Sequence, residues 1–435
     1  MLEGPSFLIA RDLPSACEQE SKWIYNTYHV IELSKGKRRL QDAEEIGSTK
    51  SSKPLNPVEK EDFISSQQSH NQGTEGDRTS LGSGSLIGQI GKDLSISCLI
   101  RCSRADYGSI ASLNRDFRSL IRSGELYRLR RLMGITEHWV YFSCSLLEWE
   151  AFDPIHCRWM HLPTMMSNDC FMCSDKESLA VGTELLVFGK EILSFVTYKY
   201  SILTNSWSPG VKTNTPRCLF GSASLGEIAI VAGGCDSQGN ILSSAELYNS
   251  ETGTWVILPS MNKARKLCSG VFMEGKFYVV GGVGVGSSVM LTSGEVYDLK
   301  TRTWHEIPDM YPALNSGAED NNTPATSKAP PLLAVVKNEL YAAYYARMEV
   351  LKYDKKRNSW NTIGKLPEQA SSMNGWGLAF RSCGDQLIVI GGPRSYQRGF
   401  IEINSWDPDD GPPRWNLLGL KQSGSFVYNC AVMGC

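Results

Sequence analysis

The sequence lacks long apolar runs and an excess of charge of either sign. Its N-terminal stretch has only one short apolar run, Phe7–Ala10, whereas a membrane helix needs about 20 consecutive apolar residues. The formal net charge is −2, which leaves no general excess of positive charge for binding a polyanion. We therefore expect no signal peptide, no membrane span and no general nucleic-acid binding.

A recurring Tyr–Trp spacing indicates an internal repeat. Between Ala245 and Met261, Tyr248 precedes Trp255 with turn-forming residues between them. The closing tryptophans recur about 50 residues apart, at Trp159, Trp207, Trp255, Trp304, Trp360 and Trp415. Apolar residues alternate on both sides of each turn, which is typical of a β-hairpin. A second hairpin ending in Gly-Gly precedes the clearest copies, so each unit is expected to contain four strands.

Four-stranded units of this size have two apolar faces that neighbouring units must cover. Radial packing of six units meets this requirement, so we predict an all-β six-bladed β-propeller over residues 139–435. The Gly-Gly pairs at 233–234 and 281–282, each followed by the Tyr and Trp of the hairpin, resemble the kelch family. The first unit is one strand short, and the residues after Trp415 resemble an opening strand. We therefore expect the C-terminal strand to close the first blade.

The segment 1–87 is poor in apolar residues, particularly between 41 and 85. Such a composition cannot offset the entropy cost of ordering, so a largely disordered N-terminal arm is expected. Residues 21–34 are compatible with a docking peptide or a frayed element. The basic run Lys35–Leu40 is compatible with a nuclear-import signal or a solvated tail.

Residues 88–134 break the β pattern. Ile110, Leu113, Phe117, Leu120 and Ile121 recur at three- and four-residue spacing, which predicts short amphipathic helices. Ser123-Gly124 separates the last of three expected helices. Three helices in this length cannot enclose a core of their own, so one apolar face is expected to meet a partner.

The order of these helical segments, IGKDLSISCL, RADYGSIASLNRDFRSLIRS and ELYRLRR, resembles the F-box. The family's opening Leu-Pro is Ile90-Gly91 here, and its central Trp is Phe117. The resemblance implies binding to the Skp adaptor of cullin-based ubiquitin ligases. The implied contact residues are Ile90, Leu94, Ile96, Leu99, Leu113, Phe117, Leu120 and Ile121. A disordered arm, an F-box and six kelch repeats in this order are similar to the F-box/kelch-repeat proteins of plants.

Eight arginines and three acidic residues between 101 and 131 give the helical segment a local charge of +5. A nucleic-acid site would combine such a patch with aromatic residues for stacking on one face. Complementarity to an acidic adaptor surface needs only the charge. We favour the second interpretation and expect no nucleic-acid partner.

No motif specifies catalysis or a bound metal. The glycine-rich run Gly281–Ser288 lacks the spacing of a dinucleotide loop and precedes a strand. The zinc-ligand residue types His156, His161, Cys170 and Cys173 fall on different predicted blades. The histidines do not converge on a copper site of the kind found in galactose oxidase. Thirteen scattered cysteines indicate reduced thiols in an intracellular protein. We expect no enzyme activity and no cofactor.

The loops between second and third strands should emerge beside the connections between blades, and we expect a protein substrate to bind at this rim. The predicted contacts are Arg217, Lys263, Arg265, Trp376, Arg394, Tyr396 and Arg398. Arg217 and Arg265 are equally compatible with bracing neighbouring blades. Two functions remain open: a substrate receptor of a ubiquitin ligase in the nucleus or cytoplasm, and a kelch scaffold whose F-box no longer binds the adaptor.

Overall fold

The structure is a computed structural model. It describes residues 86–435 apart from 88–89, 145–146, 169, 193, 287–289, 312–327, 371, 373, 393–398 and 424–425, and it does not describe the side chains of 173–175. Residues 1–85 of the predicted N-terminal arm lie outside the described residues.

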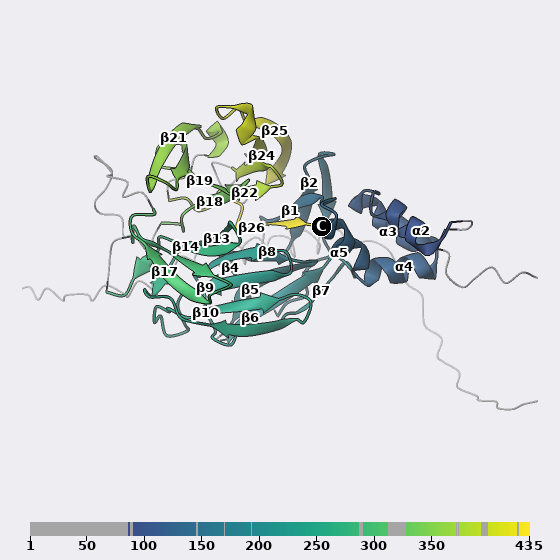
Figure 1. Cartoon of the computed structure of the whole chain (residues 1–435), viewed down its shortest axis with the longest axis horizontal. Coiled ribbons are helices and arrows are strands. Elements are labelled where there is room, and N and C mark those ends of the chain that lie inside the picture. The colour runs from purple at the N-terminus through teal and green to yellow at the C-terminus, as the bar shows by residue number, and fades with distance from the viewer. Residues whose placement is uncertain are drawn as a thin grey trace, which may run out of the picture. The chain divides into compact units, whose positions relative to one another are not determined.

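Six four-stranded antiparallel sheets are arranged around one axis as a six-bladed β-propeller (Figure 1), as the repeat predicts. The first blade contains β26 (Asn429–Gly434), β1 (His138–Ser143), β2 (Trp149–Asp153) and β3 (Arg158–His161). The second contains β4 (Phe171–Val181), β5 (Glu184–Glu191), β6 (Ser194–Ser201) and β7 (Ser206–Pro209), and the third β8 (Gly221–Leu225), β9 (Ile228–Ala232), β10 (Ala245–Asn249) and β11 (Thr254–Leu258).

The remaining blades follow the same order from the axis outwards. The fourth contains β13 (Ser269–Met273), β14 (Lys276–Val280), β16 (Gly294–Asp298) and β17 (Thr303–Ile307), and the fifth β18 (Leu333–Val336), β19 (Glu339–Tyr344), β20 (Glu349–Asp354) and β21 (Ser359–Lys365). The sixth contains β22 (Ala379–Cys383), β23 (Gln386–Gly391), β24 (Gly399–Trp406) and β25 (Asn416–Ser423). A further two-stranded sheet pairs β12 (Arg265–Lys266) with β15 (Val283–Gly284). Two short 3-10 turns follow β21 and β24, namely η3 (Glu368–Ala370) and η4 (Pro408–Asp410).

The spacing of the repeat follows from cross-strand pairing. Tyr248 and Trp255 lie directly opposite each other on β10 and β11, with ring centroids 5.0 Å apart. The indole Nε1 of Trp255 donates a hydrogen bond of 3.0 Å to the carbonyl of Val211, in the connection from the preceding blade. The same pair and the same type of bond recur in the second, fourth and fifth blades. The repeat therefore supplies both a hairpin contact and a link between blades.

The C-terminal strand closes the ring. β26 pairs antiparallel with β1 over six residue pairs, from His138 opposite Gly434 to Ser143 opposite Asn429. The innermost strand of the first blade therefore comes from the far end of the sequence, as predicted, and both edges that would otherwise remain open are paired.

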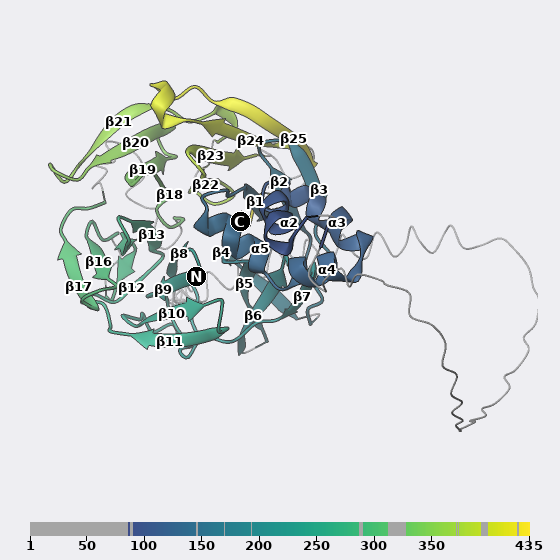
Figure 2. The same cartoon turned by 45° about the vertical axis from the view of Figure 1, so that its right-hand side comes forward.

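The segment before the propeller forms helices, shown in front of the first two blades in Figure 2. They are α2 (Lys92–Leu99), the 3-10 turn η1 (Arg104–Asp106), α3 (Tyr107–Leu113), α4 (Arg115–Arg122) and α5 (Glu125–Leu132). The prediction of three helices was wrong because Asn114 divides the middle one. Asn114 has extended backbone, and its Oδ1 accepts a hydrogen bond of 2.8 Å from the amide of Phe117, so it caps α4. None of the described helices has the length and apolarity needed to cross a membrane.

Candidate functional site

The helical module, residues 90–134, contacts the turns on one face of the propeller. A Cβ on Gly124 would lie 3.4 Å from Cδ1 of Leu203, in the β6–β7 turn. Arg131 forms an ion pair with Glu227, in the β8–β9 turn. In an antiparallel meander, the turns joining the first to the second strand and the third to the fourth strand emerge on the same side. We call this side the module face.

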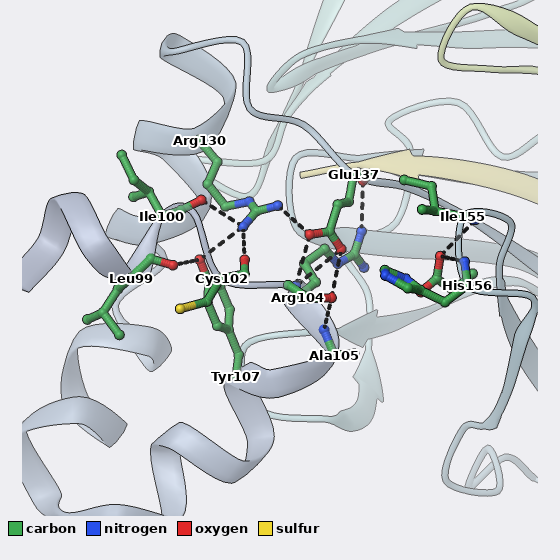
Figure 3. Close-up of polar contacts among 12 residues, drawn as sticks. Leu99, Ile100, Cys102, Arg104, Ala105, Tyr107, Arg130, Glu137, Ile155 and His156 are labelled. Carbon is green, nitrogen blue, oxygen red and sulfur yellow. Dashed lines mark hydrogen bonds and ion pairs between the residues drawn. The ribbon is translucent and has the colours of Figure 1, made fainter.

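The carboxylate of Glu137 joins the helices to the first blade (Figure 3). Glu137 lies between α5 and β1, and its Oε1 accepts a 2.8 Å bond from Nη2 of the buried Arg130. The amide of Arg104 donates to the same carboxylate at 3.1 Å. Nη1 of Arg130 donates to the carbonyls of Ile100 and Cys102. Glu137 therefore neutralises a buried cation and holds two separate segments of the module at the start of the propeller.

Arg104 extends this junction to the C-terminal strand. Its Nη2 donates a 2.7 Å hydrogen bond to the hydroxyl of Tyr141 on β1, and its Nη1 donates to the carbonyl of Met433 on β26 at 3.3 Å. The guanidinium lies 4.2 Å from the ring centroid of Trp139. Burial, together with the positive charge of Arg104, lowers the pKa of His138 below its usual value. The module is therefore attached to both strands that close the ring.

The predicted adaptor contacts divide into a buried and an exposed group. The buried group is Leu99, Phe117, Leu120 and Ile121, whose side chains belong to one apolar core shared with the first and second blades. These four side chains are therefore buried in this structure. Leu94 and Leu113 are 61% and 70% exposed, and Ile90 and Ile96 are partly exposed. Leu132 and Met133, at the end of α5, are also exposed and were not predicted.

The basic patch is smaller than the sequence suggests. Arg104 and Arg130 are buried, and Arg131 is paired with Glu227. The arginines that remain exposed are Arg101, Arg115, Arg118, Arg122 and Arg128. Arg115, Arg118 and Arg122 lie on α4 and Arg128 lies on α5, whereas Leu94 and Leu113 lie on α2 and α3. The exposed surface of the module therefore carries both apolar and basic side chains.

The opposite side of the propeller, which we call the far face, carries the loops between second and third strands, such as 233–244, and the connections between blades, such as 210–220 and 259–268. Of the predicted substrate contacts here, Arg217 and Arg265 are buried. Arg265 pairs with Glu295 at 2.9 Å, both side chains being 0% exposed, and donates to the carbonyls of Gly281 and Ser293. Arg217 makes the equivalent bonds in the third blade, with Glu246 at 2.7 Å. Both arginines are therefore buried and brace the connection that enters the blade against that blade.

Their glutamate partners were missed. Glu246 and Glu295 also accept hydrogen bonds from amides of the connection that enters the blade, for example Thr215 and Lys263. Each glutamate lies two residues before the tyrosine of its repeat, at Tyr248 and Tyr297. That recurring position is a signal from which they could have been found.

The other predicted rim residues differ in their placement. Lys263 is exposed and pairs with Glu306. Trp376 is partly exposed and packs beside Leu267 and Val283, with Nζ of Lys176 5.9 Å from its ring centroid. Arg394, Tyr396 and Arg398 lie outside the described residues.

The residue types considered for a metal have other contacts. Nδ1 of His156 lies 2.7 Å from Asp153, and Nδ1 of His161 lies 3.0 Å from Glu150. Among the residues that the structure describes, no three His, Cys, Asp or Glu side chains form a group that could hold a metal ion.

Comparisons with known proteins agree with this architecture. The family model of the Kelch motif matches residues 216–262 and 264–311, the units that contain the Arg217–Glu246 and Arg265–Glu295 pairs. The chain is 59% identical to F-box/kelch-repeat protein At1g74510 of Arabidopsis thaliana over 100% of both sequences. It is 57% identical to F-box/kelch-repeat protein SKIP11 of the same plant, covering 99% of this chain and 98% of that protein. The chain belongs to the F-box/kelch-repeat family.

Proposed function

We propose that the chain is the substrate-recognition subunit of a Skp–cullin–F-box ubiquitin ligase in the nucleus or cytoplasm. Residues 88–134 act as the F-box and bind the Skp adaptor, and through it a cullin. The propeller, residues 139–435, binds a protein substrate, and other subunits carry out ubiquitin transfer. The chain itself is a non-catalytic receptor in this proposal.

The observation that carries the proposal is the exposed pair Leu94 and Leu113. They are 61% and 70% exposed and lie on α2 and α3, within the segment whose order of helices resembles the F-box. The exposed arginines of the module supply complementarity to an acidic adaptor surface, which speeds association.

The arrangement of the two faces supports the second half of the proposal. The module occupies one face, so the far face remains open to a substrate while the adaptor is bound. The partly exposed Trp376 and the exposed Lys263 lie in its connections, and aromatic residues are frequent anchors of interfaces. Because the module is joined to the first blade through buried arginines, the adaptor-binding and substrate-binding surfaces keep the same position and orientation relative to each other.

A pull-down with the purified Skp adaptor tests the adaptor half. The wild-type chain should retain the adaptor, and Leu94→Asp or Leu113→Asp should weaken retention at least about 10-fold because a charge enters a contact centre. The matched control is Ile257→Asp on β11, where the side chain is 63% exposed and far from the helices in sequence. Equal loss in the control, or no loss in the leucine variants, would contradict the assignment.

A second function is favoured by three residues that differ from the F-box pattern, Ile90-Gly91 in place of Leu-Pro and Phe117 in place of Trp. A kelch scaffold that does not bind the adaptor would fold normally yet retain no adaptor even at low salt. Co-purification from cells with the proteasome blocked tests substrate binding separately. Proteins that bind the wild type should be lost from Trp376→Ala and kept by Leu94→Asp.

A further inference from the structure

Two cysteines face each other on the far face of the third blade. Cys218 and Cys235 form an isolated antiparallel bridge in which each amide donates to the other's carbonyl, at 2.9 and 2.8 Å. Their Sγ atoms are 3.5 Å apart. The pairing joins the connection that enters the blade to the loop that follows β9.

The backbone of this bridge has the spacing that a disulfide needs. Directly opposed residues that exchange both hydrogen bonds have Cα atoms about 5.5 Å apart, and disulfides span Cα distances of about 4.4–6.8 Å. Small rotations of the two side chains therefore suffice to bring the sulfurs into bonding distance. We propose that Cys218 and Cys235 are an oxidation site at which a peroxide produces a reversible disulfide.

The chemistry needs one peroxide molecule and no other oxidant. The thiolate of Cys218, the more accessible of the two, attacks a peroxide oxygen and becomes a sulfenic acid while water leaves. The thiol of Cys235 then attacks the Cys218 sulfur, and the sulfenic oxygen departs as a second water. Two thiols lose two protons and two electrons, and hydrogen peroxide takes them up to become two waters. Because Cys218 is partly exposed, a thiol reductant can attack the disulfide and restore both thiols.

Other described cysteines lack this combination. Cys268 and Cys430 are buried, and burial raises the pKa of each thiol to about 11, which disfavours the reactive thiolate. Cys98, Cys157 and Cys170 are exposed, but none of them has a cross-strand sulfur partner in the described structure. They are internal controls for indiscriminate oxidation.

The disulfide would fix the geometry of the far face at this blade. Cys218 follows the brace residue Arg217, and Cys235 begins a loop that Ile241 closes by a second bridge to Cys235. Within that loop Asp236 accepts hydrogen bonds from the backbone of Gln238 and Asn240. Oxidation therefore joins a connection between blades to an already ordered loop. This site does not depend on the proposed ligase function.

Peptide mapping of the full chain tests the proposal. After treatment with hydrogen peroxide and blocking of remaining thiols with iodoacetamide, trypsin releases residues 218–263, which contain both cysteines. This peptide should be unalkylated and two hydrogens lighter, and treatment with dithiothreitol before blocking should restore alkylation at both positions. A second digestion after glutamate cuts at Glu227, between the two cysteines, and the fragments that carry Cys218 and Cys235 should then separate only on reduction.

Variants test the order of the steps. Cys235→Ser should leave a sulfenic acid at Cys218 that dimedone traps, and Cys218→Ser should leave Cys235 unmodified. Oxidation confined to Cys98, Cys157 and Cys170 in the wild type, with an alkylated 218–263 peptide, would overturn the proposal. So would a disulfide that joins either cysteine to a third one.

Discussion

Replacing Glu137 by alanine is expected to loosen the joint between the helices and the first blade. Arg130 is 1% exposed and would lose its counter-ion, while it keeps the carbonyls of Ile100 and Cys102. Breaking a buried pair by removing one partner costs about 3–5 kcal/mol. Because the Glu137 side chain is 15% exposed, water can partly replace it, and we expect a loss of about 3 kcal/mol, at the lower end of that range.

Native-state hydrogen exchange measures this loss where it arises. A loss of about 3 kcal/mol should speed exchange of amides in α5 and β1 by roughly 100-fold, with little change in the fourth and fifth blades. Glu137→Gln keeps the acceptor but removes the charge, so its effect should be smaller, about 1–2 kcal/mol. Glu251→Ala, in the exposed β10–β11 turn, is the control. Unchanged exchange in both Glu137 variants would refute the role of this carboxylate.

Three further predictions concern the propeller. Arg265→Ala leaves Glu295 buried without its cation and should lower the free energy of unfolding, measured in urea, by about 3–5 kcal/mol. The control Lys263→Ala removes an exposed cation and should change that free energy by less than about 1 kcal/mol. Equal effects of the two substitutions would contradict the bracing role of Arg265. The pKa of His138 is lowered in the folded chain, so as the pH falls its imidazole is protonated in the unfolded chain before it is protonated in the folded chain. The free energy of unfolding should therefore be highest above about pH 6.5 and should decrease as the pH falls towards the folded-state pKa of His138. Melting temperatures measured across this range should show the loss, and His138→Gln should reduce it. Removing residues 429–435 deletes β26 and should lower and broaden the melting transition; melting like that of the intact chain would contradict the closure.

The propeller could be predicted because its signal is local and repeated. Tyr248 and Trp255 need a fixed spacing to meet across a two-strand turn, and the same requirement recurs in other blades. The pairing of β26 with the first blade could be predicted because the first unit lacked one strand and the residues after Trp415 could supply it.

Which apolar residues of the helices are buried could not be predicted in the same way. A three- and four-residue spacing shows which side of α4 is apolar, but not which surface covers it. Phe117, Leu120 and Ile121 therefore looked available to a partner, although they are buried in the apolar cluster that the helices share with the first two blades. Glu137 left no signal at all, because one glutamate at a helix–strand junction has no pattern to distinguish it from a solvated side chain.

The pairing of β26 with β1 also has a consequence for biosynthesis. β1 is made at the beginning of the propeller and must wait for residues 429–434 before its inner edge is covered. Throughout translation the growing chain therefore carries an unpaired apolar edge, which is a target for aggregation and for holding chaperones. Ring closure can follow only after β26 has left the ribosome, so a stop codon that removes β26 should deplete the protein in cells even though the other strands of the six blades have been made.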